Sequence, residues 1–463
     1  MDRTQAPITV KALPVDIGCL LDEGPFGLFQ RLVIALAATS VVLDGFDGQL
    51  IGFAIPAIAR DWGIARGAFA FALAAGIFGM GVGSACVGLL ADRFGRRWAL
   101  IGSVLLFGFA TCSVGLARNL VALGVLRFVA ALGIGGAIPT STTLAAEFTP
   151  LRKRTFVVTA TIVCVPLGGM VAGFFARGIL PVYGWRALFF VGGAIPILFS
   201  ILILIALPES PRFLVRHPGR WRELSRLLEH MSRLVAPETE FSDISEQKAE
   251  RKADRLRGIS ALFSPDYLRD SIALWCAFFM SLFTIYSAFN WLPTMLASAG
   301  LGDAIASEGL TVYNLGGVIG ALLCALIIGR YGSRWPMLIC CVGAAGSALF
   351  LRQIHLLDHT SLLLYGLGVH GLFINAVQST MAALCAHVYP TAFRATGTAS
   401  AFAFGRIGAL VSAFAGAAVI SASGSSGYLL MWAIAMLMVF IALASVRNHI
   451  PSVQATALKI GRN

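Results

Sequence analysis

Charged residues are scarce in this sequence. They make up only 13% of its 463 residues, whereas 57% are hydrophobic and the mean hydropathy is +0.82. Soluble globular domains carry about 25% charged residues, so the composition excludes a soluble globular protein. It indicates an integral membrane protein.

Motifs of ATP-driven pumps and zinc hydrolases are also absent. The chain has five lysines, and none of them follows a glycine. It therefore has no G-x-x-x-x-G-K-[ST] loop, in which the lysine reaches the phosphates of a nucleotide. No H-E-x-x-H zinc motif occurs either. We therefore expect neither an enzyme nor an ATP-driven pump, and no cofactor.

A receptor is also not expected. It would need a sizeable cytoplasmic domain, and the central loop between the two groups of apolar stretches is too polar to form much of a core.

The sequence lacks a disulfide framework and a clear metal site. Nine cysteines lie scattered, mostly within apolar stretches, and no C-x-x-C pair occurs. Such a pattern predicts neither paired cysteines nor a metal centre. His355 and His359 flank Asp358 and could hold a metal ion. A solvated loop is the better interpretation because no further ligands accompany them.

Apolar stretches of membrane-spanning length are abundant. A helix needs about 20 apolar residues to cross the hydrocarbon layer, and twelve such windows can be counted. They run over residues 31–55, 68–91, 98–117, 120–143, 155–177, 186–207, 271–293, 309–329, 335–352, 360–386, 396–420 and 426–446. The predicted fold is therefore all-α, with twelve transmembrane helices.

Basic residues predict the orientation of these helices. An even number of spans places both termini on one side of the membrane, and 27 of the 35 Lys and Arg residues fall in the termini and in the loops after even-numbered spans. Because positive residues collect on the cytoplasmic side, both termini are expected in the cytoplasm. The net charge of +12 follows from this bias and does not indicate nucleic-acid binding. We expect no cleavable signal peptide in the N-terminal segment, which lacks a short apolar core with a cleavage site.

Internal sequence repeats predict two similar halves. The stretch 88–98 has a counterpart at 325–335. A second set recurs at a nearly equal offset, where Pro150, Arg154 and Gly168 correspond to Pro390, Arg394 and Gly408. Two nearly equal offsets indicate a duplicated six-helix unit, with the substrate site near the membrane midplane where the halves meet.

This repeat divides the chain into five segments. We expect a cytoplasmic N-terminal segment, a first six-helix half, a cytoplasmic central loop, a second six-helix half and a cytoplasmic tail, over residues 1–30, 31–207, 208–270, 271–446 and 447–463.

Two carboxylates lie inside the first apolar stretch. Asp44 would lie roughly 20 Å into a helix that begins near Arg31, within a hydrocarbon layer about 30 Å thick. Asp47 is three residues further and shares its face. A carboxylate at this depth costs about 2.5 to 3.5 kcal/mol, so it usually faces a wet cavity or a partner. Two such groups favour proton binding, which predicts proton coupling. An ion pair with an arginine of a neighbouring helix is the alternative.

Two arginines also lie within predicted spans. Arg127 is in the fourth span, and Arg406 is the only charged residue of the eleventh. The planar guanidinium can bind a carboxylate through two hydrogen bonds, so both arginines are candidates for binding an anionic substrate. Arg127 could instead pair with Asp44, Asp47 or Glu147, and Arg406 with an aspartate of the first half.

Several motifs resemble those of a known transporter superfamily. Residues 88–97 (GLLADRFGRR) resemble the loop signature of the major facilitator superfamily, and residues 208–212 (PESPR) resemble the motif that ends the sixth span in many members. Residues 44–47 (DGFD), followed by 51–56 (IGFAIP) and 61–63 (DWG), resemble the aromatic acid:proton symporter family, whose members import benzoate-type acids into bacteria.

Further segments agree with this resemblance, which extends from Asp44 to Val446. They are GGAIP at 135–139, GWRALF at 184–189, NWLP at 290–293, YPT at 389–391, RATG at 394–397 and GR at 405–406. The second-half loop departs from the pattern, since Gly329 stands where the first half has Asp92 and Ser333 replaces a basic residue.

The resemblance implies roles for further residues. In the family an arginine and a glutamate of this region matter for transport, and they correspond to Arg127 and Glu147. We therefore expect Glu147 to take part in proton coupling with the first-span aspartates. The family pattern also implies a gate at the cytoplasmic turns, formed by Asp92, Arg93, Arg96, Arg97 and Arg394. A solvated cluster of charges that sets the orientation is the alternative.

A ring-shaped substrate also needs apolar walls and a few polar contacts. The candidates are Phe46, Tyr286, Asn290, Trp291, Asn314, Asn375 and Gln378. Asn314 and Asn375 could bond a ring hydroxyl, although hydrogen bonds between helices explain such residues equally well.

The sequence thus predicts a proton-coupled importer of aromatic carboxylic acids such as hydroxybenzoates, working by alternating access in a bacterial inner membrane as a monomer. Its partners would be the aromatic carboxylate, protons and the lipid bilayer. The alternative is a proton-coupled carrier of another organic anion, a sugar or a drug.

Overall fold

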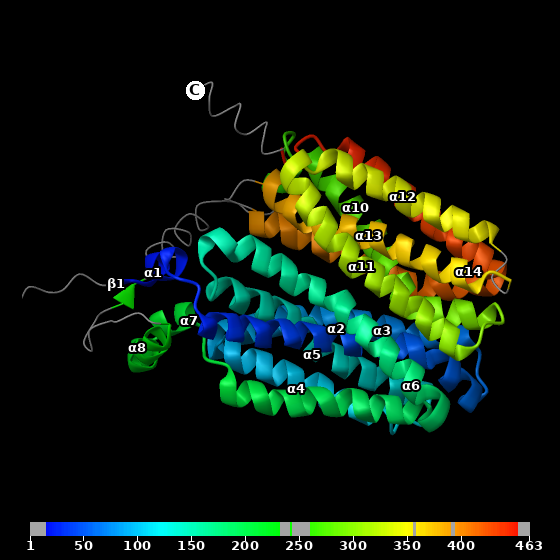
Figure 1. Ribbon diagram of the computed structural model, residues 1–463, viewed down its shortest axis with the longest axis horizontal. Coiled ribbons are helices and arrows are strands. Elements are labelled where there is room, and N and C mark those ends of the chain that lie inside the picture. Colours follow the sequence, from blue (N-terminus) through cyan, green and yellow to red (C-terminus); the bar gives the residue numbers. More distant parts are fainter. Residues whose placement is uncertain (1–14, 232–240, 243–259, 355–357, 390–393, 452–463) are drawn as a thin grey trace, which may run out of the picture.

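The computed structural model describes residues 15–231, 241–242, 260–354, 358–389 and 394–451, and nearly all of them are helical (Figure 1). The α-helices are α1 Ile17–Glu23, α2 Leu28–Trp62, α3 Ala70–Phe94, α4 Arg96–Val114, α5 Leu120–Glu147, α6 Leu151–Ala206, α7 Pro211–Val215, α8 Trp221–His230, α10 Leu268–Ser298, α11 Asp303–Tyr331, α12 Arg334–Gln353, α13 Thr360–Val388 and α14 Arg394–Ser445. Three short 3-10 helices are η1 Arg66–Phe69, η2 Pro218–Arg220 and η3 Ser260–Phe263, and two strands are β1 Val15–Asp16 and β2 Phe241–Ser242.

The described helices make twelve crossings of the expected bilayer. Ten helices are long and apolar enough to span it. Two of these, α6 with 56 residues and α14 with 52, are far longer than the roughly 20 residues that one crossing needs. Each is interrupted by one glycine outside helical geometry, Gly184 at φ 74° and Gly424 at φ 58°, where the chain turns back. The predicted number of spans is therefore confirmed.

The twelve crossings form two bundles, α2–α6 and α10–α14, as Figure 1 shows. Equivalent glycines bring equivalent helices together in each bundle. A Cβ at Gly168 of α6 would collide with the carbonyl oxygen of Val42 on α2, and one at Gly408 of α14 with that of Phe279 on α10. The two glycines are 240 residues apart in the sequence and their two partners are 237 apart, which are the separations of the repeated sequence stretches. The contacts confirm a duplicated six-helix unit.

One end of the molecule carries additional short elements. We call the end with α1, α7 and α8 the terminal face, and the opposite end, where α2 and α10 finish, the far face (Figure 1). The polar central segment builds more core there than its composition predicts. Leu224, Leu227 and Leu228 of α8 are buried, as are Ile17 and Leu21 of α1, and all five belong to one apolar cluster.

The two bundles contact each other at the far face and near the midplane. Arg60 pairs with Asp303, and Arg177 lies 3.4 Å from Glu308, so α2 and α6 are both tied to α11. Towards the terminal face, a cavity of about 300 Å³ separates α6 from α13 and is lined by Arg154, Thr159 and Ser379 among others. Over the described residues, ion pairs therefore join the halves at the far face, and a cavity lies between α6 and α13 towards the terminal face.

Candidate functional site

A cavity of about 50 Å³ lies between the two halves near the midplane. It is lined by residues of α2, α3, α5 and α6 on one side and of α10 and α14 on the other: Asp44, Gly45, Gly48, Gln49, Ile51, Leu73, Gly76, Ile77, Met80, Arg127, Ile134, Gly135, Ile138, Val165, Tyr286, Phe289, Asn290 and Arg406. A benzene-sized molecule fits a cavity of about 150 Å³. A ring-shaped ligand therefore requires this site to widen.

Asp44 is the carboxylate that lines this cavity. Its side chain is only 3% exposed, and its Oδ1 has no hydrogen-bond partner among the described residues. The neighbouring charges that act on it are the guanidinium of Arg406, on the opposite half, and the carboxylate of Asp47. A buried carboxylate without its own donor is costly to keep charged, so Asp44 is chemically suited to bind and release a proton.

Asp47 lies in a different environment, one turn along α2. Thr111 of α4 donates a hydrogen bond to its Oδ1 at 2.5 Å, and Nη1 of Arg127 lies 3.7 Å from its Oδ2. Arg127 Nη1 also donates to the backbone carbonyl of Asp47 at 3.4 Å. Both side chains are buried, at 0% and 3% exposure. Asp47 and Arg127 thus form a buried ion pair inside the first half, which was one of the alternatives for Arg127.

Arg406 reaches the cavity from α14 and contacts neutral groups. Its Nη1 donates to the hydroxyl of Tyr286 at 2.9 Å and lies 3.3 Å from the sulfur of Met80. The Tyr286 hydroxyl points its own proton towards the same sulfur, at 3.6 Å. A thioether is a weak acceptor, so these contacts hold the guanidinium in place without neutralising its charge. An anion that enters the cavity can replace the sulfur.

Two amides mark the side of the cavity nearer the far face. Asn290 lines the cavity, and its Nδ2 is buried without a partner among the described residues. Asn314 is fully buried and donates to Gln49 Oε1 at 2.8 Å, while Gln49 Nε2 lies 3.4 Å from Asn314 Oδ1. The Asn314 amide therefore joins α2 to α11, as expected for a hydrogen bond between helices.

The remaining candidate substrate contacts lie outside the cavity. Phe46 packs edge-on against Phe175, and the indole N–H of Trp291 donates to the carbonyl of Ala413 at 3.1 Å. Asn375 donates to its own helix, and Gln378 accepts from Ser281 at 2.7 Å. Among the sequence candidates, the cavity itself brings together Asp44, Arg127, Tyr286, Asn290 and Arg406.

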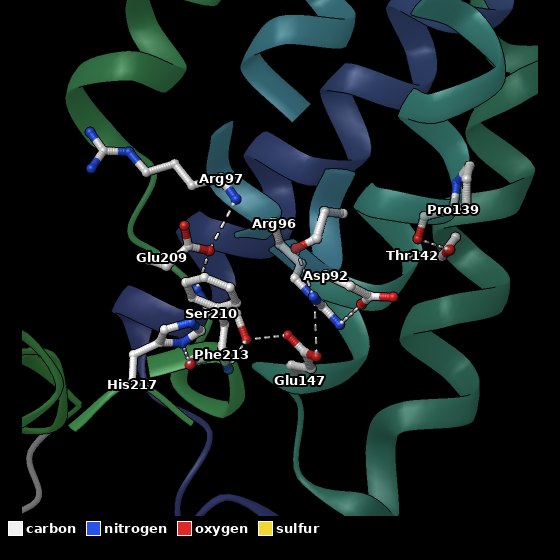
Figure 2. Close-up of polar contacts among 11 residues, drawn as sticks. Asp92, Arg96, Arg97, Pro139, Thr142, Glu147, Glu209, Ser210, Phe213 and His217 are labelled. Carbon is white, nitrogen blue, oxygen red and sulfur yellow. Dashed lines mark hydrogen bonds and ion pairs between the residues drawn. The ribbon is translucent and has the colours of Figure 1, made fainter. Parts of the chain in front are cut away.

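The charged residues at the terminal face form a separate cluster (Figure 2). Arg96 pairs with Asp92 at 2.8 Å and lies 3.8 Å from Glu147, which accepts a hydrogen bond from Ser210. Glu147 ends α5, about 30 Å of helix beyond Arg127. The structure therefore places Glu147 with the candidate gate residues and not beside the first-span aspartates.

The cluster continues along the loop between α3 and α4. The backbone N–H of Arg97 donates to Glu209 at 3.1 Å, and its guanidinium donates to the carbonyl of Leu204 at 2.6 Å. Figure 2 shows Glu209 and Ser210 reaching this loop from the segment that follows α6. The motif after the sixth span thus fixes the turn before the third span.

The other two gate candidates have simpler contacts. Arg93 is exposed and lies over the ring of Phe94. Arg394 begins α14, and its Nε donates to the carbonyl of Tyr389 at 3.3 Å. The corresponding residue of the first half, Arg154, makes the same type of bond to Ala146, so both arginines bind a carbonyl at the end of the fourth span of their half.

Sequence reasoning missed three residues of the site: Gln49, Met80 and Thr111. The hydroxyl of Thr111 and the amide of Gln49 interrupt apolar spans, which is a usable signal. Met80 offered no signal in the sequence, because methionine is a common apolar residue in membrane helices. For the metal question, no group of three His, Cys, Asp or Glu residues suited to a metal occurs among the described residues, and His355 lies outside them.

Sequence comparison identifies one family model and several known transporters that resemble this chain. The family model of the Major Facilitator Superfamily matches residues 37–351 and 274–459. The chain is 32% identical to a gallate transporter of Pseudomonas putida over 88% of this chain and 89% of that protein. It is also 32% identical to the 4-hydroxybenzoate transporter PcaK of Acinetobacter baylyi over 95% of both chains.

Solved structures agree in fold. The xylose transporter XylE of Escherichia coli in its inward open conformation has a TM-score of 0.72 at 16% identity, covering 90% of this chain and 97% of that one. A bacterial homologue of the human lysosomal transporter Spinster has a TM-score of 0.62 at 16% identity, covering 90% of this chain and 96% of that one.

Proposed function

The chain belongs to the Major Facilitator Superfamily, a superfamily of transporters and not of enzymes, and from that premise we propose that it is a proton-coupled importer of aromatic carboxylic acids. The observation that carries the proposal is the presence of two oppositely charged groups on opposite sides of one midplane cavity. Within the described part of the chain, Asp44 of the first half has no hydrogen-bond donor at Oδ1, and Arg406 of the second half is a guanidinium held by neutral neighbours.

The substrate class follows from Arg406 and from the relatives. A guanidinium can bind a carboxylate through two hydrogen bonds, and the cavity walls that surround it are mostly apolar. The relatives named above are described as transporters of gallate and of 4-hydroxybenzoate, both aromatic carboxylates. When Asp44 carries a proton, an uncharged sugar would leave the charge of Arg406 unmatched in the membrane, so this site favours an anion over a sugar.

Coupling follows from competition for Arg406. When Asp44 is charged, Arg406 is its counter-ion, and a substrate carboxylate placed beside both experiences repulsion from Asp44. When Asp44 carries a proton, the guanidinium is free to bind the substrate. Tight substrate binding therefore requires a proton on Asp44, and the two travel together. Asp47 is already paired with Arg127 and hydrogen-bonded to Thr111, so we assign it to holding the first half together and not to carrying the proton.

The terminal-face cluster supports a role in gating for Asp92, Arg96, Arg97 and Glu147. All four lie in the first half and contact each other or the segment after α6. The Asp92 side chain is 64% exposed in this state, in which a cavity lies between α6 and α13 on the same side. We propose that Asp92 contacts the second half when that side closes. Such contacts stabilise the outward-facing state and break as the transporter opens inwards.

The terminal face is assigned to the cytoplasmic side of the membrane. Basic residues collect near the terminal face in the sequence pattern, so we assign that face to the cytoplasm and the protein to the bacterial plasma membrane. The present state then opens inwards. Because each chain contains both halves of the site, a monomer is sufficient for transport.

Uptake of labelled 4-hydroxybenzoate by expressing cells tests the function, with and without a protonophore and with competing aromatic acids and sugars. We expect accumulation that the protonophore abolishes and that benzoate-type acids compete away. Uptake that persists with the protonophore would contradict proton coupling. Competition by sugars but not by aromatic acids would contradict the substrate class.

A further inference from the structure

The far face carries an uneven distribution of charge between the two halves. Within the described residues, the far-face end of the first half has five arginines against one aspartate: Arg60, Arg66, Arg118, Arg177 and Arg186 against Asp61. The far-face end of the second half has three carboxylates against one arginine: Asp303, Glu308 and Asp358 against Arg352. The first half is therefore cationic at this face, and the second half is anionic.

This asymmetry is concentrated in two ion pairs that cross between the halves. Arg60 of α2 binds both carboxylate oxygens of Asp303, one of them at 3.1 Å. Arg177 of α6 lies 3.4 Å from Glu308. In both pairs the cation comes from the first half and the anion from α11. A movement that opens the far face by moving the two halves apart separates α11 from α2 and α6, and so breaks both pairs.

Separation leaves two arginines at the mouth of the opened path. Their side chains are already 58% and 55% exposed in the closed state, so solutes can reach them. Along α2, Arg60 lies about 24 Å of helix from Asp44. α6 also lines the cavity, at Val165. The two helices that carry these arginines therefore lead from the far face to the central site.

We propose that Arg60 and Arg177 form a transient binding site for the carboxylate of the arriving substrate. The inference rests on the proposed function, because it assumes an anionic substrate that arrives from the far face. The substrate carboxylate takes the place of Asp303 or Glu308 when the halves separate. It thus compensates the arginines that the open state leaves unpaired, and the two acids on α11 direct it towards the first half.

Breaking the same pairs from either side tests this site. The arginine-side variant is Arg60→Gln with Arg177→Gln, and the acid-side variant is Asp303→Asn with Glu308→Gln. Both remove the same two ion pairs, but only the first removes the proposed carboxylate site. Arg118→Gln is the matched control for loss of an exposed far-face charge, since Arg118 lies outside both pairs. Initial rates of labelled 4-hydroxybenzoate uptake give KM for the far face, and membrane abundance of each variant is measured alongside.

We expect the arginine-side variant to raise KM about threefold to tenfold, as the loss of two exposed ionic contacts implies. The acid-side variant should leave KM unchanged or lower it, and Arg118→Gln should change it by less than about twofold. The increase should also shrink at high ionic strength, because salt screens exposed charges.

Equal changes of KM in the arginine-side and acid-side variants would overturn the proposal, since the pairs would then act only in closing the far face. An equal effect of Arg118→Gln would also overturn it, by showing general attraction and no site. Failure of the proposed function gives a different result, because the unmodified protein would then take up no aromatic acid.

Discussion

Replacing Asp44 with asparagine separates substrate movement from proton movement. The asparagine keeps the size and polarity of the side chain but carries no titratable group. In the unmodified protein, Asp44 and a bound carboxylate would share Arg406. Two like charges about 5 Å apart repel by about 3 kcal/mol at an effective dielectric constant of about 20. A charged Asp44 therefore weakens substrate binding by more than about a hundredfold, and a proton on Asp44 removes this penalty.

Two quantities follow from this argument. One proton carried with one monovalent anion makes an electroneutral step, so each unit of pH difference can drive about a tenfold concentration gradient, equivalent to about 1.4 kcal/mol. The Asp44→Asn variant should equilibrate substrate to a ratio of one under the same pH difference. Its substrate affinity should be independent of pH, whereas that of the unmodified protein should rise as pH falls and Asp44 becomes protonated.

The assay uses proteoliposomes with a pH step of one unit, and it records both net accumulation and exchange of labelled for unlabelled substrate. We expect Asp44→Asn to lose accumulation and keep exchange. Accumulation by this variant to the same ratio as the unmodified protein would refute the assignment of the proton to Asp44. Asp47→Asn serves as the comparison, since the sequence alone assigns it the same role.

Three further predictions concern other residues. Arg406→Lys loses the bidentate fork and should raise KM for uptake about tenfold or more, whereas unchanged kinetics would indicate a structural pair. Asp47→Asn leaves Arg127 as a buried unpaired charge and should destabilise the protein by about 3 to 5 kcal/mol. Thermal unfolding in detergent measures this loss. Restoration of the melting temperature by adding Arg127→Met would confirm that the lost ion pair is its cause. Gly45→Ala should lower the melting temperature because a Cβ would collide with the backbone of Val165. Gly48→Ala should not, since no atom of the described residues lies within 4 Å of its added Cβ. Equal effects of the two changes would contradict the helix contact at Gly45.

The fold was largely predictable because the membrane restricts the choices. Apolar length alone identifies the spans, and the repeat offsets identify the two halves. The sequence did not show that short helices of the N-terminal and central segments share a core. Neither segment is apolar enough by itself, and Leu21 and Leu224 become buried only when the two segments meet.

The site was predictable in its residue types but not in its pairings. Charged residues inside apolar spans identified Asp44, Asp47, Arg127 and Arg406. Helical spacing puts both aspartates on one face, but it does not fix how that face is turned towards α5 and α14. The structure pairs Asp47 with Arg127 and leaves Asp44 in the cavity. Pairings between helices that are distant in the sequence depend on helix rotation, which no local pattern encodes.

Proton movement during substrate transport directly distinguishes coupled from uncoupled transport. Purified protein is reconstituted into vesicles that contain a pH-sensitive dye, and 4-hydroxybenzoate is added outside in the absence of any pre-formed gradient. Proton-coupled transport through Asp44 predicts acidification of the vesicle interior that follows substrate uptake in the unmodified protein and is absent in Asp44→Asn. Substrate uptake by the unmodified protein without a change in internal pH would contradict proton-coupled transport through this site.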